Sequence, residues 1–391
     1  MPNTVVFSRN KIAYLLFSIG TGWSLTTGCV KSYNPPATQV NYRYLAIDGV
    51  LINSADSPSV FALSRTVRLT DTTTASVPET GARVSVEGKS GVVYSFTELP
   101  GGMYKSTPLL LNISDQFRLK ITTSDGENYA SDFVAVKQAP PIDSITWTQP
   151  GDVQISANTH DPGNNTHYYR WNYTETWQYT APEQSELGVK DGIMFYVEVD
   201  TADQKYNCWS TDYSTNILVG TSVALQQDII SHAPIAVVPQ NSVKISVRYS
   251  INVNQYALTP EAYQYFQVLQ KNTEILGSIF DAQPTQLTGN IHSLSRPSEV
   301  VIGYFSASSV QQARIFIGKH DVANWHYLYP GQECNPIQTT AGSPTNLYLY
   351  TYPDSAYTAY YFCGTGCIFV DRVSCLDCTV QGGINKRPSF W

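Results

Sequence analysis

Short runs of alternating apolar and polar residues recur along most of this 391-residue chain, and they limit its fold more than any other feature. Such alternation places successive side chains on opposite faces of an extended strand. Gly, Ser, Asp and Pro separate the runs at short intervals, which is typical of a β-sandwich. The pattern therefore predicts an all-β protein whose first folded domain is a sandwich over residues 43–140. Its alternating runs are 44–48, 60–64, 82–86, 92–96, 117–121 and 129–133.

Pro140 and Pro141 mark the boundary to a second, larger β-rich domain, which we place at residues 141–391. Extended runs continue there, and the clearest is at 168–177. A helix is expected near 259–272, because Thr259 can cap its N-terminus and the proline that follows suits a first helical turn. The predicted fold is therefore β-rich with one or two helices.

Charged residues are only 14% of the chain, whereas tyrosine is frequent, with 27 residues. Low charge with many Tyr, Thr and Ser favours an extracellular β-protein over a helical one. The formal net charge is −7, and no cluster of basic residues occurs. Since nucleic-acid binding requires a basic surface, nucleic acid is not an expected partner.

Residues 1–28 have the pattern of a bacterial lipoprotein signal peptide. Two basic residues, Arg9 and Lys11, precede an apolar run at 12–19, and small residues at 26–28 lead into Cys29. The apolar run is too short and too interrupted by glycine to span a bilayer. Leu25 lies four residues before the cysteine, where three is usual. We predict cleavage before Cys29, acylation of that residue, and an acylated tether over 29–42.

An ordinary secretory signal, with Cys29 as a seventh disulfide cysteine, is the alternative. Removing Cys29 leaves an even number of cysteines, which favours the lipid anchor. Several acyl chains of the palmitate type anchor a protein firmly, at about 0.8 kcal/mol for each buried methylene. The expected partner is thus the outer membrane, reached through the lipid on Cys29.

Six further cysteines are candidates for three disulfides, because an exported protein is oxidised. Sequence alone cannot choose among the many possible pairings. Four of the six fall within residues 363–378, with a spacing that could also bind zinc or, at its last two cysteines, exchange disulfides. An oxidising compartment and the lack of a βαβ unit favour a stapled, Cys-rich tail over 363–391, with no metal and no cofactor. The disulfide candidates are Cys208, Cys334, Cys363, Cys367, Cys375 and Cys378.

Catalytic motifs do not stand out in this sequence. It holds no G-x-S-x-G elbow, no HExxH, no phosphate-binding loop and no dinucleotide fingerprint. His160, Asp161 and His167 could contribute to a metal or acid–base site, although scattered histidines more often form loop hydrogen bonds. We therefore assign no catalytic residue and expect a protein that is not an enzyme.

Three tyrosines could form a binding surface. Residues 347–352 alternate, which would place Tyr348, Tyr350 and Tyr352 on one face of a strand and two leucines on the other. If the leucine face is buried, the tyrosines form an exposed platform for a sugar or a partner protein. Alternatively, a second sheet or the stapled tail covers them.

Several segments together carry a family resemblance. They are 63–66, 81–84, 97–104, 140–144, 169–171, 261–263, 277–281, 283–284, 289–292 and, most specifically, 375–391. With these residues the chain resembles the Bacteroidota lipoproteins grouped as domain of unknown function 4249, over essentially all of the mature chain.

The resemblance implies an Ig-like or carboxypeptidase-regulatory-like sandwich for the first domain. It also implies an outer-membrane location, at the cell surface or on the periplasmic face, beside a TonB-dependent transporter barrel. It carries over no catalytic residues. We therefore expect a non-catalytic accessory or binding subunit of such a transporter. The alternatives are a surface hydrolase acting on glycan or protein, and a structural or assembly factor of an outer-membrane machine.

Overall fold

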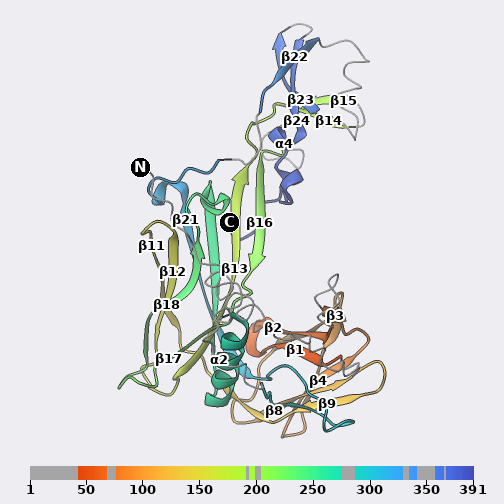
Figure 1. The fold of residues 1–391 in the computed structure, drawn as a ribbon, viewed down its shortest axis with the longest axis vertical. Coiled ribbons are helices and arrows are strands. Elements are labelled where there is room, and N and C mark those ends of the chain that lie inside the picture. Colours follow the sequence, from red (N-terminus) through yellow and green to blue (C-terminus); the bar gives the residue numbers. More distant parts are fainter. Residues whose placement is uncertain are drawn as a thin grey trace, which may run out of the picture. The chain divides into compact units, whose positions relative to one another are not determined.

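The computed structural model describes residues 43–67, 76–190, 193–198, 204–274, 287–328, 334–340, 357–364 and 367–391. Across these ranges the chain folds mainly into β-strands, with two α-helices, so the all-β prediction is confirmed (Figure 1). Cys29, the tether over 29–42 and the tyrosines at 348, 350 and 352 lie outside the described residues. Within the ranges above, no helix has both the length and the apolar content needed to cross a membrane.

The strands up to residue 137 form a β-sandwich. Strands β1, β2 and β7 pair in one layer, and β4, β8 and β9 pair in the other. The strands are β1 (Leu45–Gly49), β2 (Leu51–Thr66), β3 (Ser76–Pro78), β4 (Arg83–Gly88), β5 (Val93–Ser95), β6 (Thr97–Leu99), β7 (Met103–Leu109), β8 (Gln116–Thr122), β9 (Asn128–Ser131) and β10 (Val134–Lys137).

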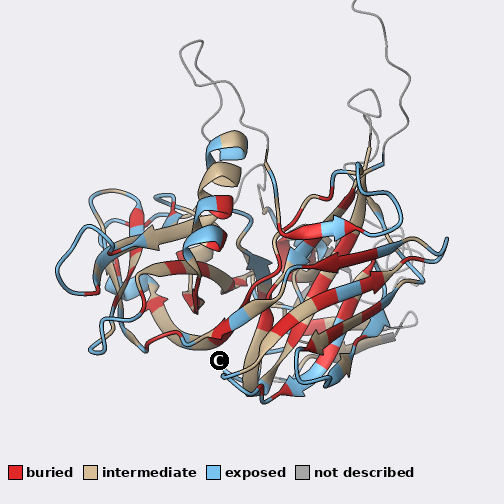
Figure 2. Ribbon diagram, turned by 90° about the horizontal axis from the view of Figure 1, so that it is seen from below, coloured by how far each residue is buried: buried red, intermediate tan, exposed pale blue. Residues whose placement is uncertain are grey.

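Alternation builds the core of this sandwich. Strand β8 buries Phe117, Leu119 and Ile121, whereas the residues between them are more exposed. Phe61 and Tyr104 enter the same core from the opposite layer. Figure 2 shows buried residues alternating with more exposed ones along the strands. The period of two in the sequence is therefore the period of the packed structure.

The later strands form several sheets, and the longest of them surround a separate core. They are β11 (Ile142–Thr148), β12 (Val153–His160), β13 (Tyr168–Thr180), β14 (Leu187–Lys190), β15 (Ile193–Tyr196), β16 (Asn207–Tyr213), β17 (Leu218–Thr221), β18 (Ile229–Val238), β19 (Arg248–Ala257), β20 (Ile291–Ser293), β21 (Ala307–Gly318), β22 (Ile337–Thr340), β23 (Tyr357–Gly364) and β24 (Cys367–Arg372). Long antiparallel ladders join β13 to β19 and β19 to β21, and a sheet of β11, β12 and β18 contributes to the same core.

Helices are few in the described chain. They are the α-helices α2 (Pro260–Glu274) and α4 (Val373–Leu376) and the 3-10 turns η1 (Val243–Ile245), η2 (Lys319–Asp321) and η3 (Cys378–Gln381). Helix α2 occupies the segment near 259–272 where the sequence predicted one. The Thr259 hydroxyl accepts the Ala262 N–H at 3.2 Å, and the Thr259 carbonyl accepts the Tyr263 N–H at 3.0 Å. This cap satisfies donors that the first helical turn leaves unpaired.

Strand β21 connects the two sets of strands. Its first residues, Ala307 and Ser308, pair in parallel with β2 and with β10. From Val310 to Gly318 the same strand pairs antiparallel with β19. At the crossover the buried Ser308 hydroxyl accepts the Ala257 N–H at 3.0 Å, and the Ser309 hydroxyl accepts the Ala139 N–H at 2.9 Å. Side-chain oxygens thus replace ladder acceptors where the strand changes partners.

The chain passes between the two cores more than once. After α2, strand β20 pairs with β9, and Val301, Phe305 and Ala307 pack in the core of the first sandwich. Residues 291–307 therefore complete the core that residues 45–136 begin. We call residues 291–307 the return segment. The sequence placed it in the second domain, because an apolar residue does not by itself indicate which core it enters.

Replacing Ser308 with alanine should destabilise the fold. The change leaves the buried Ala257 N–H without its acceptor, so we expect the free energy of unfolding to fall by about 1–3 kcal/mol. Urea denaturation followed by tryptophan fluorescence measures this loss. The control is Ser124→Ala at an exposed turn, which should change stability by no more than about 0.5 kcal/mol. Equal effects of the two substitutions would contradict the role of Ser308.

Candidate binding cleft

A cavity of about 670 Å³ opens where β1 and β2 of the sandwich meet β13 and α2. This volume lies within the range of small-molecule sites. Its lining combines apolar, aromatic, hydroxyl and carboxamide side chains around one arginine, Arg170. The residues that the following paragraphs use are Asp48, Arg170, Asn172, Asn254, Tyr265, Phe266, Gly303 and Tyr304.

Alternation along β13 places Arg170 between the buried residues Tyr169 and Trp171. Its guanidinium carbon lies 4.2 Å from the centre of the Phe266 ring, a cation–π contact that orients the group. One nitrogen, Nη2, lies 3.5 Å from an Asp48 carboxylate oxygen. The Asp48 side chain is 78% exposed, so this ion pair contributes little energy and leaves access to solvent.

The other terminal nitrogen of Arg170, Nη1, is buried and has no hydrogen-bond partner among the described residues. Unpaired buried donors are uncommon, because each one loses its hydration without compensation. A guanidinium fork matches the two oxygens of a carboxylate or phosphate. Arg170 is therefore positioned to receive an anionic group of a ligand.

Apart from Asp48, the polar groups around Arg170 are neutral hydrogen-bonding groups. The Asn254 amide donates to the Asn172 side-chain oxygen at 2.7 Å, which fixes both carboxamides. Burial raises the pKa of Tyr265 to about 12, and burial also raises the pKa of Tyr304. Both phenols therefore stay protonated at neutral pH and can donate as well as accept hydrogen bonds. Such a lining suits a polar organic ligand with an anionic end.

Close backbone contact fixes one wall of the cleft. The Ile47 N–H donates a hydrogen bond to the Ile302 carbonyl oxygen at 2.8 Å. Gly303 has a φ of +143°, and a Cβ at this position would lie 2.4 Å from the Ile47 oxygen. A side chain cannot be accommodated there, so glycine permits the return segment to approach β1. The cleft wall therefore depends on the crossing of the chain between the two cores.

The cysteines predicted to pair do so in three disulfides, Cys208–Cys378, Cys334–Cys375 and Cys363–Cys367. The four cysteines within residues 363–378, whose spacing could have suited zinc, are distributed over these three disulfides. A group of Cys334, Asp371 and Cys375 has atoms close enough to share a metal, but its two sulfurs are joined to each other.

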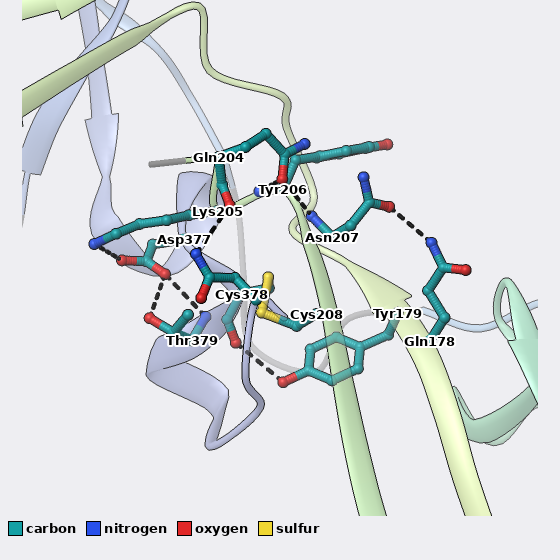
Figure 3. The surroundings of a disulfide bond; sticks show 11 residues. Gln178, Tyr179, Gln204, Lys205, Tyr206, Asn207, Cys208, Asp377, Cys378 and Thr379 are labelled. Atoms are coloured by element: carbon teal, nitrogen blue, oxygen red, sulfur yellow. Dashed lines mark hydrogen bonds and ion pairs between the residues drawn. A yellow bond between two sulfur atoms is a disulfide. The ribbon is translucent and has the colours of Figure 1, made fainter. Parts of the chain in front are cut away.

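The Cys208–Cys378 bond attaches the tail to β16 (Figure 3). Around it, the Tyr179 hydroxyl donates to the Cys378 carbonyl at 3.0 Å, and Lys205 pairs with Asp377 at 2.7 Å. Both cysteines are completely buried. The bond is therefore part of a packed contact between β13, β16 and the tail.

The histidine candidates do not assemble into one site. Nδ1 of His160 lies 2.8 Å from the Asp143 carboxylate. Asp161 instead accepts main-chain N–H groups of the turn that follows it, including that of Gly163 at 2.9 Å. His160 and Asp161 therefore have different partners, and neither contacts His167 through a hydrogen bond among the described residues.

His167 belongs to a buried network that only superficially resembles a catalytic triad. Its Nδ1 lies 3.1 Å from the Ser222 hydroxyl, which in turn donates to Asp228, and Asp228 also accepts from Tyr169. In a catalytic triad the imidazole lies between the serine and the carboxylate. Here Ser222 lies between His167 and Asp228. Ser222 is also completely buried. This network stabilises the turn between β17 and β18 and offers no accessible nucleophile.

The sequence did not identify Arg170 as a candidate binding residue. It appears there only within the family-type segment 169–171. An arginine between two aromatic residues in a strand could have indicated a charged group held on a sheet face. Its ring contact with Phe266 joins positions almost one hundred residues apart, and no local pattern shows that contact.

The fold and the cleft define a disulfide-stapled β-protein with a preformed, ligand-sized cavity. A family model, Domain of unknown function (DUF4249), matches residues 30–314, and the chain belongs to this family. All residues that line the cleft fall within the matched range.

Other comparisons add little. No curated protein matches the chain. Among solved structures, the chain is similar to the Yersinia pseudotuberculosis adhesin InvE at 12% identity and a TM-score of 0.15, and the match covers 54% of each chain. A similarity this weak supports no conclusion about fold or function.

His160 should titrate above the ordinary histidine range. The hydrogen bond and charge of Asp143 raise the pKa of His160, whose usual value is about 6.5. We expect NMR titration to give a midpoint above that value in the wild type and a lower midpoint in Asp143→Asn. The contact stabilises the fold while His160 is charged, fully below about pH 6.5, and this stabilisation is lost as pH rises through the raised pKa. An unchanged midpoint in Asp143→Asn would show that the pair does not form in solution.

Removing the Cys208–Cys378 bond should destabilise the protein more than removing Cys363–Cys367. The first bond spans 170 residues and the second only 4, and cross-links that close longer loops restrict the unfolded chain more. We expect Cys208→Ala/Cys378→Ala to lower the free energy of unfolding by about 2–5 kcal/mol. Denaturant titration of both double variants measures the difference. The expectation fails if the short-loop variant loses as much stability.

Proposed function

We propose that the protein is a non-catalytic outer-membrane lipoprotein that acts as an accessory, ligand-binding subunit of a TonB-dependent transporter. The observation that carries the binding role is the cleft, where Arg170 lies against Phe266 with one buried nitrogen unpaired. The lipoprotein pattern ending at Cys29 and the family membership support the location and the partner.

The proposed mechanism is tethered binding. Acylated Cys29 attaches the chain to the membrane, and the tether over 29–42 keeps the folded body close to the transporter barrel. Tethering converts an encounter in solution into one at a high effective concentration. A polar ligand with an anionic end enters the cleft, pairs with Arg170, and is released to the barrel nearby.

Affinity purification from outer membranes in mild detergent tests this proposal. We expect the wild-type chain to fractionate with outer membranes and to recover a TonB-dependent barrel in a near-equal amount by mass spectrometry. Cys29→Ala should move the chain to the soluble fraction, because the lipid provides most of its membrane affinity. If Cys29→Ala still fractionates with outer membranes and supports uptake, the anchoring role is wrong.

A second variant separates the cleft from the barrel contact. Arg170→Met keeps the apolar stem but removes the guanidinium, so it should recover the barrel as the wild type does while transport falls. Arg83→Met at an exposed position on β4 is the matched control. Recovery of the lipoprotein alone, with no barrel, would overturn the transporter role.

A further inference from the structure

A second cavity, of about 520 Å³, lies where the tail meets β13, β16 and β19. It shares no lining residue with the cleft. Its lining consists of two arginines, four carboxamides and two tryptophans, and it contains no acidic side chain. These residues are Gln178, Gln204, Asn207, Trp209, Arg248, Asn385, Arg387 and Trp391.

Several contacts hold the tail in place beside this pocket. The Cys208–Cys378 bond lies beside Asn207 of the lining (Figure 3). The main chains of Trp209 and Ile384 exchange two hydrogen bonds, at 2.8 and 3.0 Å. The Asn385 amide also donates to the Gln204 carbonyl at 3.2 Å. The pocket is therefore preformed, which lowers the entropy that a ligand loses on binding.

Two carboxamides in the pocket are held with their amino groups available. The Gln204 side-chain oxygen accepts the N–H groups of Tyr206 and Asn207, at 3.1 and 3.2 Å. The Asn207 side-chain oxygen accepts from Gln178 at 2.9 Å (Figure 3). Because both oxygens are engaged, the amino groups of Gln204 and Asn207 are the free ends, and neither has a partner among the described residues. They are donors for acceptor-rich ligands.

The guanidinium of Arg248 is the available positive charge of the pocket. Arg248 lies 4.2 Å from the centre of the Phe316 ring and 5.6 Å from that of Trp391. The residues described include no carboxylate paired with Arg248. Arg387 donates twice to the main-chain oxygen of Trp391, at 2.6 and 3.2 Å, so its guanidinium is already engaged. In a chain of formal net charge −7, an arginine that has no acidic side chain beside it in the lining favours an anionic ligand.

The two indoles supply an apolar surface between these polar groups. Their ring centres lie 6.5 Å apart, and Trp391 is held by a hydrogen bond from its ring nitrogen to Gln178 at 3.3 Å. Trp209 is 8% exposed, and its ring nitrogen has no partner among the described residues. An indole face packs well against the C–H face of a sugar ring, while amides bond the sugar hydroxyls.

We propose that this pocket binds a saccharide that carries a carboxylate, of the uronic-acid type. The carboxylate pairs with Arg248, and the hydroxyl and ring oxygens accept from Gln204 and Asn207. The sugar ring packs on the exposed part of the Trp391 indole. A neutral sugar lacks the first of these interactions, and a simple carboxylate lacks the other two.

Calorimetric titration of the full chain with an oligogalacturonate tests the proposal. The neutral comparison is an oligogalactose of the same length, and acetate tests the carboxylate alone. We expect the acidic sugar to bind at least about tenfold more tightly than either comparison. Added salt should weaken that binding, because it screens the charge of the arginines. Absence of binding, or equal affinity for the neutral sugar, would overturn the proposal.

Substitutions locate the site. Arg387 is exposed, so Arg387→Gln should fold normally while it releases Trp391 from its main-chain contact. Arg248→Met removes the ring-stacked guanidinium that pairs with the carboxylate. Each should weaken oligogalacturonate binding by about tenfold, with Arg83→Gln as the exposed control that leaves it unchanged. Circular dichroism confirms folding. If both pocket variants bind like the wild type while Arg170→Met does not, the sugar occupies the cleft and the proposed pocket is wrong.

Discussion

The shared strand β21 is the constraint on which the rest of the structure depends. A strand can belong to two sheets only if its main-chain donors and acceptors stay paired where it changes neighbours. Here β21 pairs in parallel with β2 and β10 and then antiparallel with β19. Ser308 and Ser309 supply acceptors at that point. Because β21 belongs to both sets of strands, the return segment before it must run beside β1, and this placement forms a wall of the cleft.

Both cavities occur where segments distant in sequence meet. The cleft combines β1, β13 and α2, and the second pocket combines β13, β16 and the tail. In each, an arginine lies over an aromatic ring without a strong carboxylate partner: Arg170 over Phe266, and Arg248 over Phe316. A ring fixes a guanidinium while leaving its N–H groups available, unlike a buried carboxylate, which would occupy them.

Local features of the fold could be predicted from the sequence, and long-range ones could not. Alternation indicated strands such as β8 and β13, and Thr259 indicated the start of α2, because these signals lie within a few residues. The even number of cysteines after Cys29 indicated disulfides. Their pairing, such as Cys208 with Cys378, depends on contacts across 170 residues. The return of 291–307 to the first core and the position of Arg170 over Phe266 depend on the same kind of contact, so no local pattern specified them.

Different contacts hold the two cavities in shape. The cleft relies on backbone bonds such as that between Ile47 and Ile302, which lie inside the family-matched range. The second pocket needs tail residues from 385 onward, which lie beyond that range and are attached through Cys208–Cys378. Strand β13 contributes to both, with Arg170 near one end and Gln178 near the other. Strand β13, which pairs with β19 along most of its length, therefore contributes to both cavities at separate positions.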